Sequence, residues 1–463
     1  MSLDLERPLR SPDLDSPPLM TKRARWLVVI GFLLPGSAQL LAGNRKLGRF
    51  GLGATIVLIV GLLATIGGLL FARVATLSFF TNSIVLLVLQ ILLFAYAALW
   101  LILGLNTLRL TRLSRAHRGW RIPIAMLAIV LTVLPASGAA WAATTINAGR
   151  VLLSGLFSGA PAVEPVDGRY NILLLGTDAG ADREGMRPDS ISLVSVDAKT
   201  GQSVIIGIPR ELSSVPFPED SPMYELHPNG FGVAPNTYGE WGGCEVGRCI
   251  LNGLYAETEY YYPELYPDAV ANGSTPGIEA TKDAVTGATG LEVQFYVLIN
   301  MDAFESLINA LGGVTIDVKE RLPIGGDEFG NNVEGWIEPG VQGMDGFAAQ
   351  WYARSRYGSA AGDYARMERQ RELQAAILAQ MNPSNVLLRF QDVAAAGTEL
   401  VETDIPESML GRFVDLAGKA RGHSPLNVEL VPPAVDPDYP EFGVIQQLVA
   451  DGVAEASSGK PAE

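Results

Sequence analysis

Residues 170–178 read Y-N-I-L-L-L-G-T-D, a continuous apolar run that ends in a glycine, a threonine and a carboxylate. Such a run is typical of a strand that is buried on both faces of a sheet. Residues 191–196 and 204–208 repeat the pattern, and the K-T-G between them predicts a hairpin turn. We expect further strands at residues 295–299 and 314–318.

Helical patterns separate the later strands. Asp302 predicts the cap of a helix that Gly312 and Gly313 end, and helical spacing returns at residues 344–353 and 364–381. Strands that alternate with helices indicate an α/β fold of three layers (α/β/α), in which helices cover both faces of a central mixed sheet.

Charge divides the chain into two parts of opposite character. Of the 34 basic and 49 acidic side chains, residues 1–150 hold 15 basic but only 4 acidic ones, so the remainder is strongly acidic. An acidic domain repels nucleic-acid phosphates, and we expect no nucleic-acid partner. No second linker interrupts residues 169–456, which predicts one large domain followed by a polar tail at residues 457–463.

Three apolar runs without a charged residue lie at residues 50–71, 84–105 and 122–143. Each is long enough for a helix that crosses a bilayer, which takes about 20 residues. They predict an α-helical transmembrane region, and hence a multi-pass protein of the cell membrane. A fourth run, residues 26–42, is shorter and is interrupted by Pro35 and Gly36.

The path of residues 26–42 decides the predicted topology. If this run re-enters on the same face, the basic clusters on either side of it and the arginines at residues 109–121 all lie in the cytoplasm, as Lys and Arg usually do. Residues 1–25 are then a cytoplasmic tail, and residues 144–168 are a linker to an extracytoplasmic domain. If the run spans instead, the basic N-terminal region lies outside. A cleavable signal peptide leaves the later basic loops unexplained.

The only two cysteines, Cys244 and Cys249, lie close together in the acidic part of the chain. In an oxidising compartment this spacing predicts a local disulfide. The alternative is a metal site, but this part of the chain offers only His227 and His423 as imidazole ligands, whereas zinc takes four N or S ligands. The same scarcity weakens any hydrolase that needs a histidine base. We expect His227 to be a surface or structural residue.

Residues 351–371 read W-Y-A-R-S-R-Y-G-S-A-A-G-D-Y-A-R-M-E-R-Q-R and hold five arginines. Guanidinium groups that converge repel one another unless a polyanion lies among them, so the stretch predicts a pyrophosphate-like ligand. Arg354 and Arg356 can reach one pocket if the first helix ends near them. A surface helix with many ion pairs is the alternative, but the stretch has few acids.

The helix that follows places three polar residues on one face. Asp363, Arg366 and Gln370 have i, i+3, i+7 spacing, although Asp363 could also act only as a cap. Arg369 and Arg371 point elsewhere, and we expect them to be solvated.

Two carboxylates lie at neighbouring strand ends. Asp178 follows the first strand, where open α/β sheets place their ligands, and Asp189 opens the next. A pair of this kind suits Mg²⁺, which takes oxygen ligands and keeps waters for a phosphate partner. The alternative is that each aspartate caps a turn. Arg210 ends a third strand and by itself indicates little.

Six motifs in order now carry a resemblance: N-I-L-L-L-G-T-D, R-P-D-S-I-S-L-V-S-V-D, I-I-G-I-P-R-E, A-L-G-G-V-T-I-D-V, Y-A-R-S-R and D-Y-A-R-M-E-R-Q-R. Over about residues 170–450 the chain resembles the LytR-CpsA-Psr family of cell-envelope proteins, and the Cys-x4-Cys loop and multi-pass front are similar to actinobacterial members. The resemblance implies a membrane-tethered α/β/α domain that binds a polyprenyl pyrophosphate in an apolar cleft. It further implies transfer of a glycopolymer from that carrier to peptidoglycan through a phosphodiester, with Mg²⁺ as a helper.

The resemblance also implies roles for residues of this chain. The metal-associated pair falls on Asp178 and Asp189, and Glu211 stands where the family usually has aspartate. The implied catalytic residues are Asp189, Arg210, Arg354 and Arg356. The implied pyrophosphate-binding residues are Arg187, Arg210, Arg354, Arg356, Asp363, Arg366 and Gln370. Two other functions remain open, a polyprenyl-pyrophosphate hydrolase and a non-catalytic sensor of lipid-linked glycan.

Overall fold

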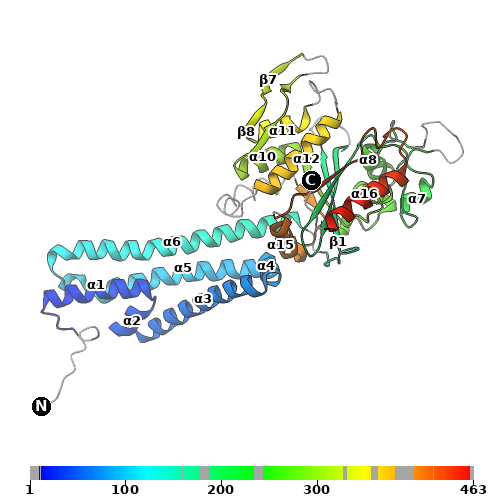
Figure 1. The fold of residues 1–463 in the computed structure, drawn as a ribbon. Coiled ribbons are helices and arrows are strands. Elements are labelled where there is room, and N and C mark those ends of the chain that lie inside the picture. The colour runs from blue at the N-terminus through cyan, green and yellow to red at the C-terminus, as the bar shows by residue number, and fades with distance from the viewer. Residues whose placement is uncertain are drawn as a thin grey trace. The chain divides into compact units, whose positions relative to one another are not determined.

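The computed structural model of the protein describes residues 10, 12–157, 160–177, 187–233, 243–326, 331–355, 363–380, 401–420 and 422–458. It divides into two compact units, Met1–Arg150 and Val151–Glu463 (Figure 1). The first unit is helical, and the second contains all the strands.

Three helices of the first unit are long and apolar enough to cross a membrane. They are α3 (Arg45–Phe71), α5 (Ser83–Thr111) and α6 (Arg118–Leu156). Many of their large apolar side chains are exposed, an arrangement that suits lipid and not water as the surrounding solvent. The short helices of this unit are α1 (Pro17–Leu33), α2 (Ser37–Ala42), α4 (Arg73–Thr81) and η1 (Leu113–Arg115).

The predicted fourth run forms parts of α1 and α2, which the chain separates at Pro35 and Gly36. Gly36 has a φ of 96°, and a Cβ there would lie 2.4 Å from the backbone nitrogen of Leu52, so only glycine permits this close approach of α2 to α3. Buried Gln39 donates to the carbonyl of Leu103 over 2.8 Å, which ties α2 to α5. Neither helix is among those long enough to span, and the re-entrant path stays a prediction.

The start of the predicted linker is helical. Helix α6 continues through Leu156, past the predicted end of the membrane run at residue 143. The reason is local, because residues 139–156 are rich in Ala and Leu, which favour helix, and the next proline is Pro161. Residues 160–165 have no regular secondary structure.

A six-stranded mixed sheet with the order β10-β3-β2-β1-β4-β9 forms the centre of the second unit. Strand β1 pairs antiparallel with β2 and parallel with β4, and β2 and β3 form the predicted hairpin. The strands are β1 (Arg169–Thr177), β2 (Pro188–Asp197), β3 (Ser203–Ile208), β4 (Phe295–Asn300), β9 (Val401–Thr403) and β10 (Leu426–Glu429).

Helices cover both faces of this sheet, which confirms the predicted α/β/α layers (Figure 1). Leu173, Leu193 and Ile206 point to one face and belong to the large core that α8 (Leu251–Tyr261), α9 (Pro276–Thr289) and α16 (Phe442–Ser457) complete. On the opposite face, Tyr170 and Phe295 pack against α15 (Leu410–Ala420). Helix α12 (Asp363–Gln380) covers another part of that face.

A smaller core lies beside α12. It joins α10 (Met301–Leu311) and α11 (Gly346–Arg354) to two short hairpin sheets. The predicted strand at residues 314–318 is β5, but it pairs in one of these small sheets with β8 (Gly340–Met344) and does not join the central sheet. The other small sheet pairs β6 (Leu322–Gly325) with β7 (Val333–Ile337). The remaining short helices are α7 (Pro222–Leu226), η2 (Pro263–Leu265), η3 (Val270–Asn272) and η4 (Glu407–Met409).

Two predicted helix starts are wrong by one or two residues. Asp302 lies inside α10, which begins at Met301, and so it is not the residue that precedes the helix. Met344 ends β8, and the following Asp345 caps α11 by accepting from the backbone N–H of Ala348 over 2.8 Å.

Cys244 and Cys249 form the predicted disulfide, with their Cα atoms 5.8 Å apart. His227 is buried between Phe217 and Phe231, with ring centroids 6.2 and 5.2 Å away. It is therefore a structural residue and not a surface one. Burial lowers the pKa of His227 to about 4, so its imidazole is neutral at physiological pH.

Candidate functional site

The face of the sheet beneath α12 carries unusually small side chains. Gly176 pairs with Ser190 on β1 and β2, and Ser192 pairs with Gly207 on β2 and β3. Because side chains alternate along a strand, these four positions lie on one face. Their small size leaves room for long polar side chains that descend from α12.

Four of the predicted site residues meet at this place. Arg210 follows β3 and forms an ion pair with the carboxylate of Asp189 at the start of β2. From α12, Arg366 donates to the backbone carbonyl of Asp189 over 3.3 Å. Gln370 accepts a hydrogen bond of 2.9 Å from the Ser190 hydroxyl. Residues that are far apart in the chain therefore converge on one end of the sheet.

These residues surround a small cavity. Its volume is about 10 Å³, which is room for about one water molecule. A phosphate group can enter only if the surrounding side chains move apart. The cavity is lined by Asp189, Ser190, Ile191, Ser192, Gly207, Ile208, Arg210, Arg366, Met367, Gln370 and Arg371.

Arg371 is part of this lining, so the prediction that it is solvated is wrong. Its side chain is 3% exposed and forms an ion pair with Glu429 of β10. Its Nη1 has no hydrogen-bond partner among the described residues. A Cβ on Gly207 would lie 2.6 Å from this atom, so the glycine makes room for the guanidinium.

Arg369 is also buried, but it serves a different purpose. Its Nε donates to the carbonyl of Tyr352 over 3.0 Å, and its Nη2 donates to the carbonyl of Ser355. Its Nη1 lies 3.2 Å from the carboxylate of Glu320. Arg369 therefore ties α12 to the C-terminal end of α11. Helical spacing predicted that both arginines are solvated because it assumed a single buried face. Helix α12 is covered on two sides, by the sheet and by α11, so it has more than one buried face.

The remaining predicted residues do not line the cavity or lie outside the described residues. Arg354 ends α11, and its guanidinium carbon lies 5.3 Å from the ring centroid of Trp351. The preceding residue, Ala353, is closer to the site, because its carbonyl accepts a hydrogen bond from Gln370. Arg187 is exposed just before β2. Asp178 and Arg356 are outside the described residues, and Asp363 begins α12 with a side chain that is not described.

The charge of the lining favours an anion. It contains the guanidinium groups of Arg210, Arg366 and Arg371 but only one carboxylate, that of Asp189. A recess that is lined by charges of one sign raises the local concentration of ligands of the opposite charge. Ser190 and Arg371 could have been found from the sequence, because they lie in the D-S-I-S and R-Q-R motifs. Nothing local in the sequence linked Glu429 to these residues.

The one carboxylate of the described lining, that of Asp189, is the group of the cavity that could contribute to a metal site. Asp189 offers carboxylate oxygens, the ligand type that Mg²⁺ prefers, and one or two carboxylates suffice for an ion that also takes phosphate oxygens and water. In the part of the chain that the structure describes, no group of three or more His, Cys, Asp or Glu side chains is placed to hold a metal.

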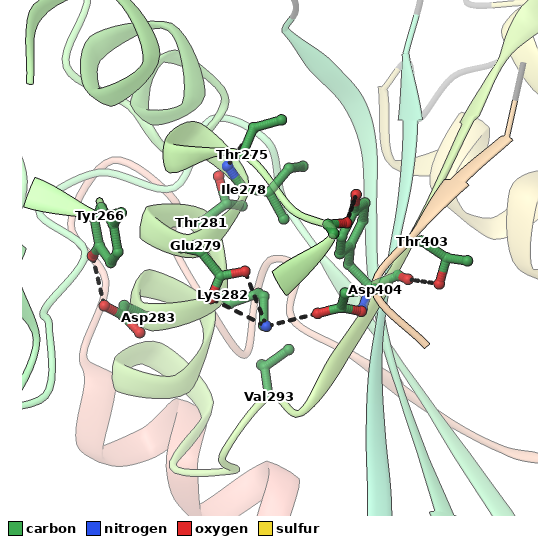
Figure 2. Close-up of polar contacts among 12 residues, drawn as sticks. Tyr266, Thr275, Ile278, Glu279, Thr281, Lys282, Asp283, Val293, Thr403 and Asp404 are labelled. Atoms are coloured by element: carbon green, nitrogen blue, oxygen red, sulfur yellow. Dashed lines mark hydrogen bonds and ion pairs between the residues drawn. The ribbon is translucent and has the colours of Figure 1, made fainter. Parts of the chain in front are cut away.

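A second polar cluster lies on the other side of the sheet, between α9, β4 and β9 (Figure 2). Lys282 lies 2.9 Å from the carboxylate of Asp404 and 3.2 Å from that of Glu279. Asp404 also accepts the backbone N–H of Tyr296 over 2.8 Å. Burial alone lowers the pKa of Lys282, but Asp404 and Glu279 outweigh burial and raise it, so the amine stays charged. The amine and the two carboxylates contact one another, so the charges of this cluster are paired internally, as in a structural ion-pair network.

The chain is similar in sequence to several bacterial proteins. It is 25% identical over 240 residues to biofilm regulatory protein A of Streptococcus mutans, covering 51% of this chain and 50% of that one. It is 24% identical over 290 residues to the polyisoprenyl-teichoic acid–peptidoglycan teichoic acid transferase TagV of Bacillus subtilis, covering 60% and 62%. It is 24% identical over 325 residues to the cell wall biosynthesis protein LcpA of Corynebacterium glutamicum, covering 66% and 59%.

The chain thus spans no more than 62% of the length of these relatives. The model of the LytR_cpsA_psr family matches residues 157–436, and this range confirms the resemblance carried by the six motifs. The chain belongs to the LytR_cpsA_psr family.

Proposed function

We propose that this chain is a membrane-anchored enzyme that transfers a glycopolymer from a polyprenyl-pyrophosphate carrier to peptidoglycan. One observation carries the proposal: Arg210, Arg366 and Arg371 converge with Asp189 on one cavity whose lining is positively charged. The relative TagV, named as a transferase that joins teichoic acid to peptidoglycan, supports the choice of substrates.

The proposed reaction is a displacement at phosphorus. A peptidoglycan hydroxyl oxygen attacks the glycan-bearing phosphorus, and the bond from that phosphorus to the bridging oxygen breaks. The products are a glycan phosphodiester and polyprenyl phosphate, and the hydroxyl proton passes to a base. Asp189 is the described carboxylate of the cavity and is our candidate for this base.

The arginines act through charge and position. Phosphoryl transfer leaves the protein little covalent work, so that fixed positive groups around the phosphate oxygens supply most of the acceleration. Arg371 has an Nη1 without a hydrogen-bond partner in the described part of the chain, and this donor lies beside the cavity. Arg210 forms an ion pair with Asp189, which holds its guanidinium group beside the cavity.

We further propose that Asp178 and Asp189 hold Mg²⁺. When bound, the ion neutralises charge on the phosphate oxygens. Asp178 follows Thr177 in the sequence, and Thr177 pairs with Pro188, the neighbour of Asp189, which supports the proposal of a shared site. The roles of Arg187, Arg354, Arg356 and Asp363 in pyrophosphate binding remain predictions of the same kind.

The proposed topology is multi-pass, with α3, α5 and α6 in the cell membrane and the second unit outside the cytoplasm. The three long apolar helices support an anchor. The disulfide between Cys244 and Cys249 supports an oxidising compartment for the domain.

The test uses the full chain in lipid nanodiscs, a polyprenyl-pyrophosphate-linked glycan, Mg²⁺ and peptidoglycan fragments. We expect glycan linked to peptidoglycan by a phosphodiester, and loss of this product when the metal is chelated. Release of phosphorylated glycan without linkage in the presence of acceptor would instead identify a hydrolase. Binding without turnover would identify a sensor. The control variant is Arg321→Gln, because Arg321 forms an exposed ion pair with Glu338 away from the cavity.

A further inference from the structure

A groove lies in the first unit, between α1 and the start of α6. Its volume is about 700 Å³, within the range of small-molecule sites. It has no part in the proposed transfer, whose cavity lies in the second unit. The groove is lined by Pro18, Thr21, Lys22, Arg25, Trp26, Val29, His117 and Trp120.

The lining is positively charged and has no carboxylate. Lys22 and Arg25 are both exposed on α1. Asp13 and Asp15 are the only acidic side chains among the described residues of this unit, and neither lines the groove. The first turn of α1 and the residue before α6 both contribute lining, and helix N-termini carry a partial positive charge. Basic side chains and helix ends therefore favour an anion.

The anion should carry an apolar part. Trp26 and Trp120 line the groove and are 54% and 46% exposed, and Val29 extends the lining farther along α1. Tryptophan of this kind gathers at the boundary between lipid tails and headgroups. The guanidinium carbon of Arg25 lies 3.4 Å from the ring centroid of Trp120, which holds the cation beside the aromatic surface.

The position along the chain agrees with a membrane boundary. The groove includes the start of α6, directly after the segment that joins the end of α5 at Thr111 to Arg118. Buried Arg23 donates to the carbonyl of Leu110 over 2.7 Å and fixes α1 against this end of α5. Thr21 accepts the backbone N–H of His117 over 3.0 Å and fixes α1 against the start of α6. The walls of the groove are therefore held together by bonds outside its charged residues.

We infer that this groove binds the phosphate headgroup of an anionic glycerophospholipid. Lys22 and Arg25 contact the phosphate, and an acyl chain follows Trp26 and Val29 toward the bilayer. A basic recess next to membrane helices is the arrangement by which proteins select anionic over zwitterionic lipids.

The test measures lipid selection by the full chain. Protein in detergent receives phosphatidylglycerol or phosphatidylcholine with the same acyl chains, and native mass spectrometry counts the lipids retained. We expect at least fivefold more retained phosphatidylglycerol for the natural chain. Lys22→Gln together with Arg25→Gln should remove this preference. Arg45→Gln with Lys46→Gln, which removes two equally exposed charges at the start of α3, should keep it.

Melting temperatures in detergent check that each variant is folded. A natural chain without preference, or a Lys22→Gln/Arg25→Gln variant that is folded and keeps it, overturns the inference. Equal loss of the phosphatidylglycerol preference in the Arg45→Gln/Lys46→Gln variant also overturns the inference, because the preference would then depend on basic residues in general and not on the groove. Complete displacement of the lipid by millimolar glycerol 3-phosphate would show that only a phosphate is bound and would contradict the role of the acyl chain.

Discussion

Two clusters of charged residues lie on opposite faces of the same sheet and differ in their charge balance. Around the cavity, three guanidinium groups face one lining carboxylate. In the other cluster, Lys282 lies between Asp404 and Glu279 and closes the network internally (Figure 2). The comparison teaches that a surplus of positive charge next to a cavity indicates an anionic ligand, whereas a buried network whose charges contact one another indicates a structural role. The variants below test this difference.

The largest effect should follow from removing an arginine of the cavity. We expect Arg366→Ala to lower the transfer rate by about 10²- to 10³-fold, the usual loss when one donor to a developing negative charge is removed. We expect the variant to remain folded, because the loss of one of the three guanidinium groups that line the cavity also relieves repulsion among them. Transfer assays and chemical unfolding of the same preparation check both expectations. Full activity in a folded Arg366→Ala protein would remove the cavity from the mechanism.

Removing Asp404 should have the opposite profile. Asp404→Ala leaves the amine of Lys282, whose side chain is 12% exposed, without its nearest partner. Loss of one member of a buried pair costs about 3–5 kcal/mol of stability. The transfer rate of the remaining folded protein should be unchanged. A double variant, Asp404→Leu with Lys282→Met, removes both charges and should be more stable than Asp404→Ala. If the double variant is as unstable as Asp404→Ala, the unpaired amine of Lys282 is not the cause of the loss.

His227 provides a third case, a buried polar group whose Nε2 has no hydrogen-bond partner in the part of the chain that the structure describes. Its pKa is lowered to about 4 by burial, whereas an unfolded histidine titrates near 6.5. Between these values the unfolded chain binds a proton that the folded chain does not. Stability should therefore be highest above pH 6.5 and should fall with decreasing pH, by up to about 1.4 kcal/mol per pH unit.

His227→Leu isolates this contribution from that of the acidic residues. Unfolding in denaturant is measured from pH 7.5 to pH 4 for both proteins. The variant should lose less stability over the acidic part of the range than the natural chain does. Parallel curves would mean that the imidazole is not held neutral in the folded state.

The smallest effect should come from Gly207→Ala, which tests whether Arg371 contributes to transfer or only to the structure. The new methyl group would lie 2.6 Å from Nη1 of Arg371 and must displace it. The displaced atom is the far end of a flexible side chain, so we expect a loss of stability of about 1 kcal/mol or less. We expect transfer to fall about 10-fold, corresponding to about 1.4 kcal/mol in the barrier. An unchanged rate would assign Arg371 to structure alone.

Much of the fold was predictable because it rests on local patterns. Apolar runs predicted β1 to β4, and Pro35 with Gly36 predicted the break between α1 and α2. The first part of the predicted linker is helical, because helix propensity, and not the end of the apolar run, determines where α6 ends. The strand at residues 314–318 was predicted correctly, but its pairing with β8 was not predictable, since nothing in a short alternating strand specifies which edge it joins.

The candidate site divides in the same way. Asp189, Arg210, Arg366 and Gln370 were recognisable from strand ends, helical spacing and ordered motifs, and the structure brings them together. Asp178 and Arg356 lie outside the described residues, so their place at the site stays a prediction.

The sequence alone determined the long apolar helices, the strand β1, the disulfide and the family, because each depends on residue types at short and regular spacing. Only the tertiary structure decided that Arg371 is buried against Glu429 and that Lys282 pairs with Asp404. These partners lie 58 and 122 positions apart in the chain. The pairing of such distant residues depends on the order of the strands in the sheet and on how many sides of a helix are covered. Local periodicity in the sequence specifies neither.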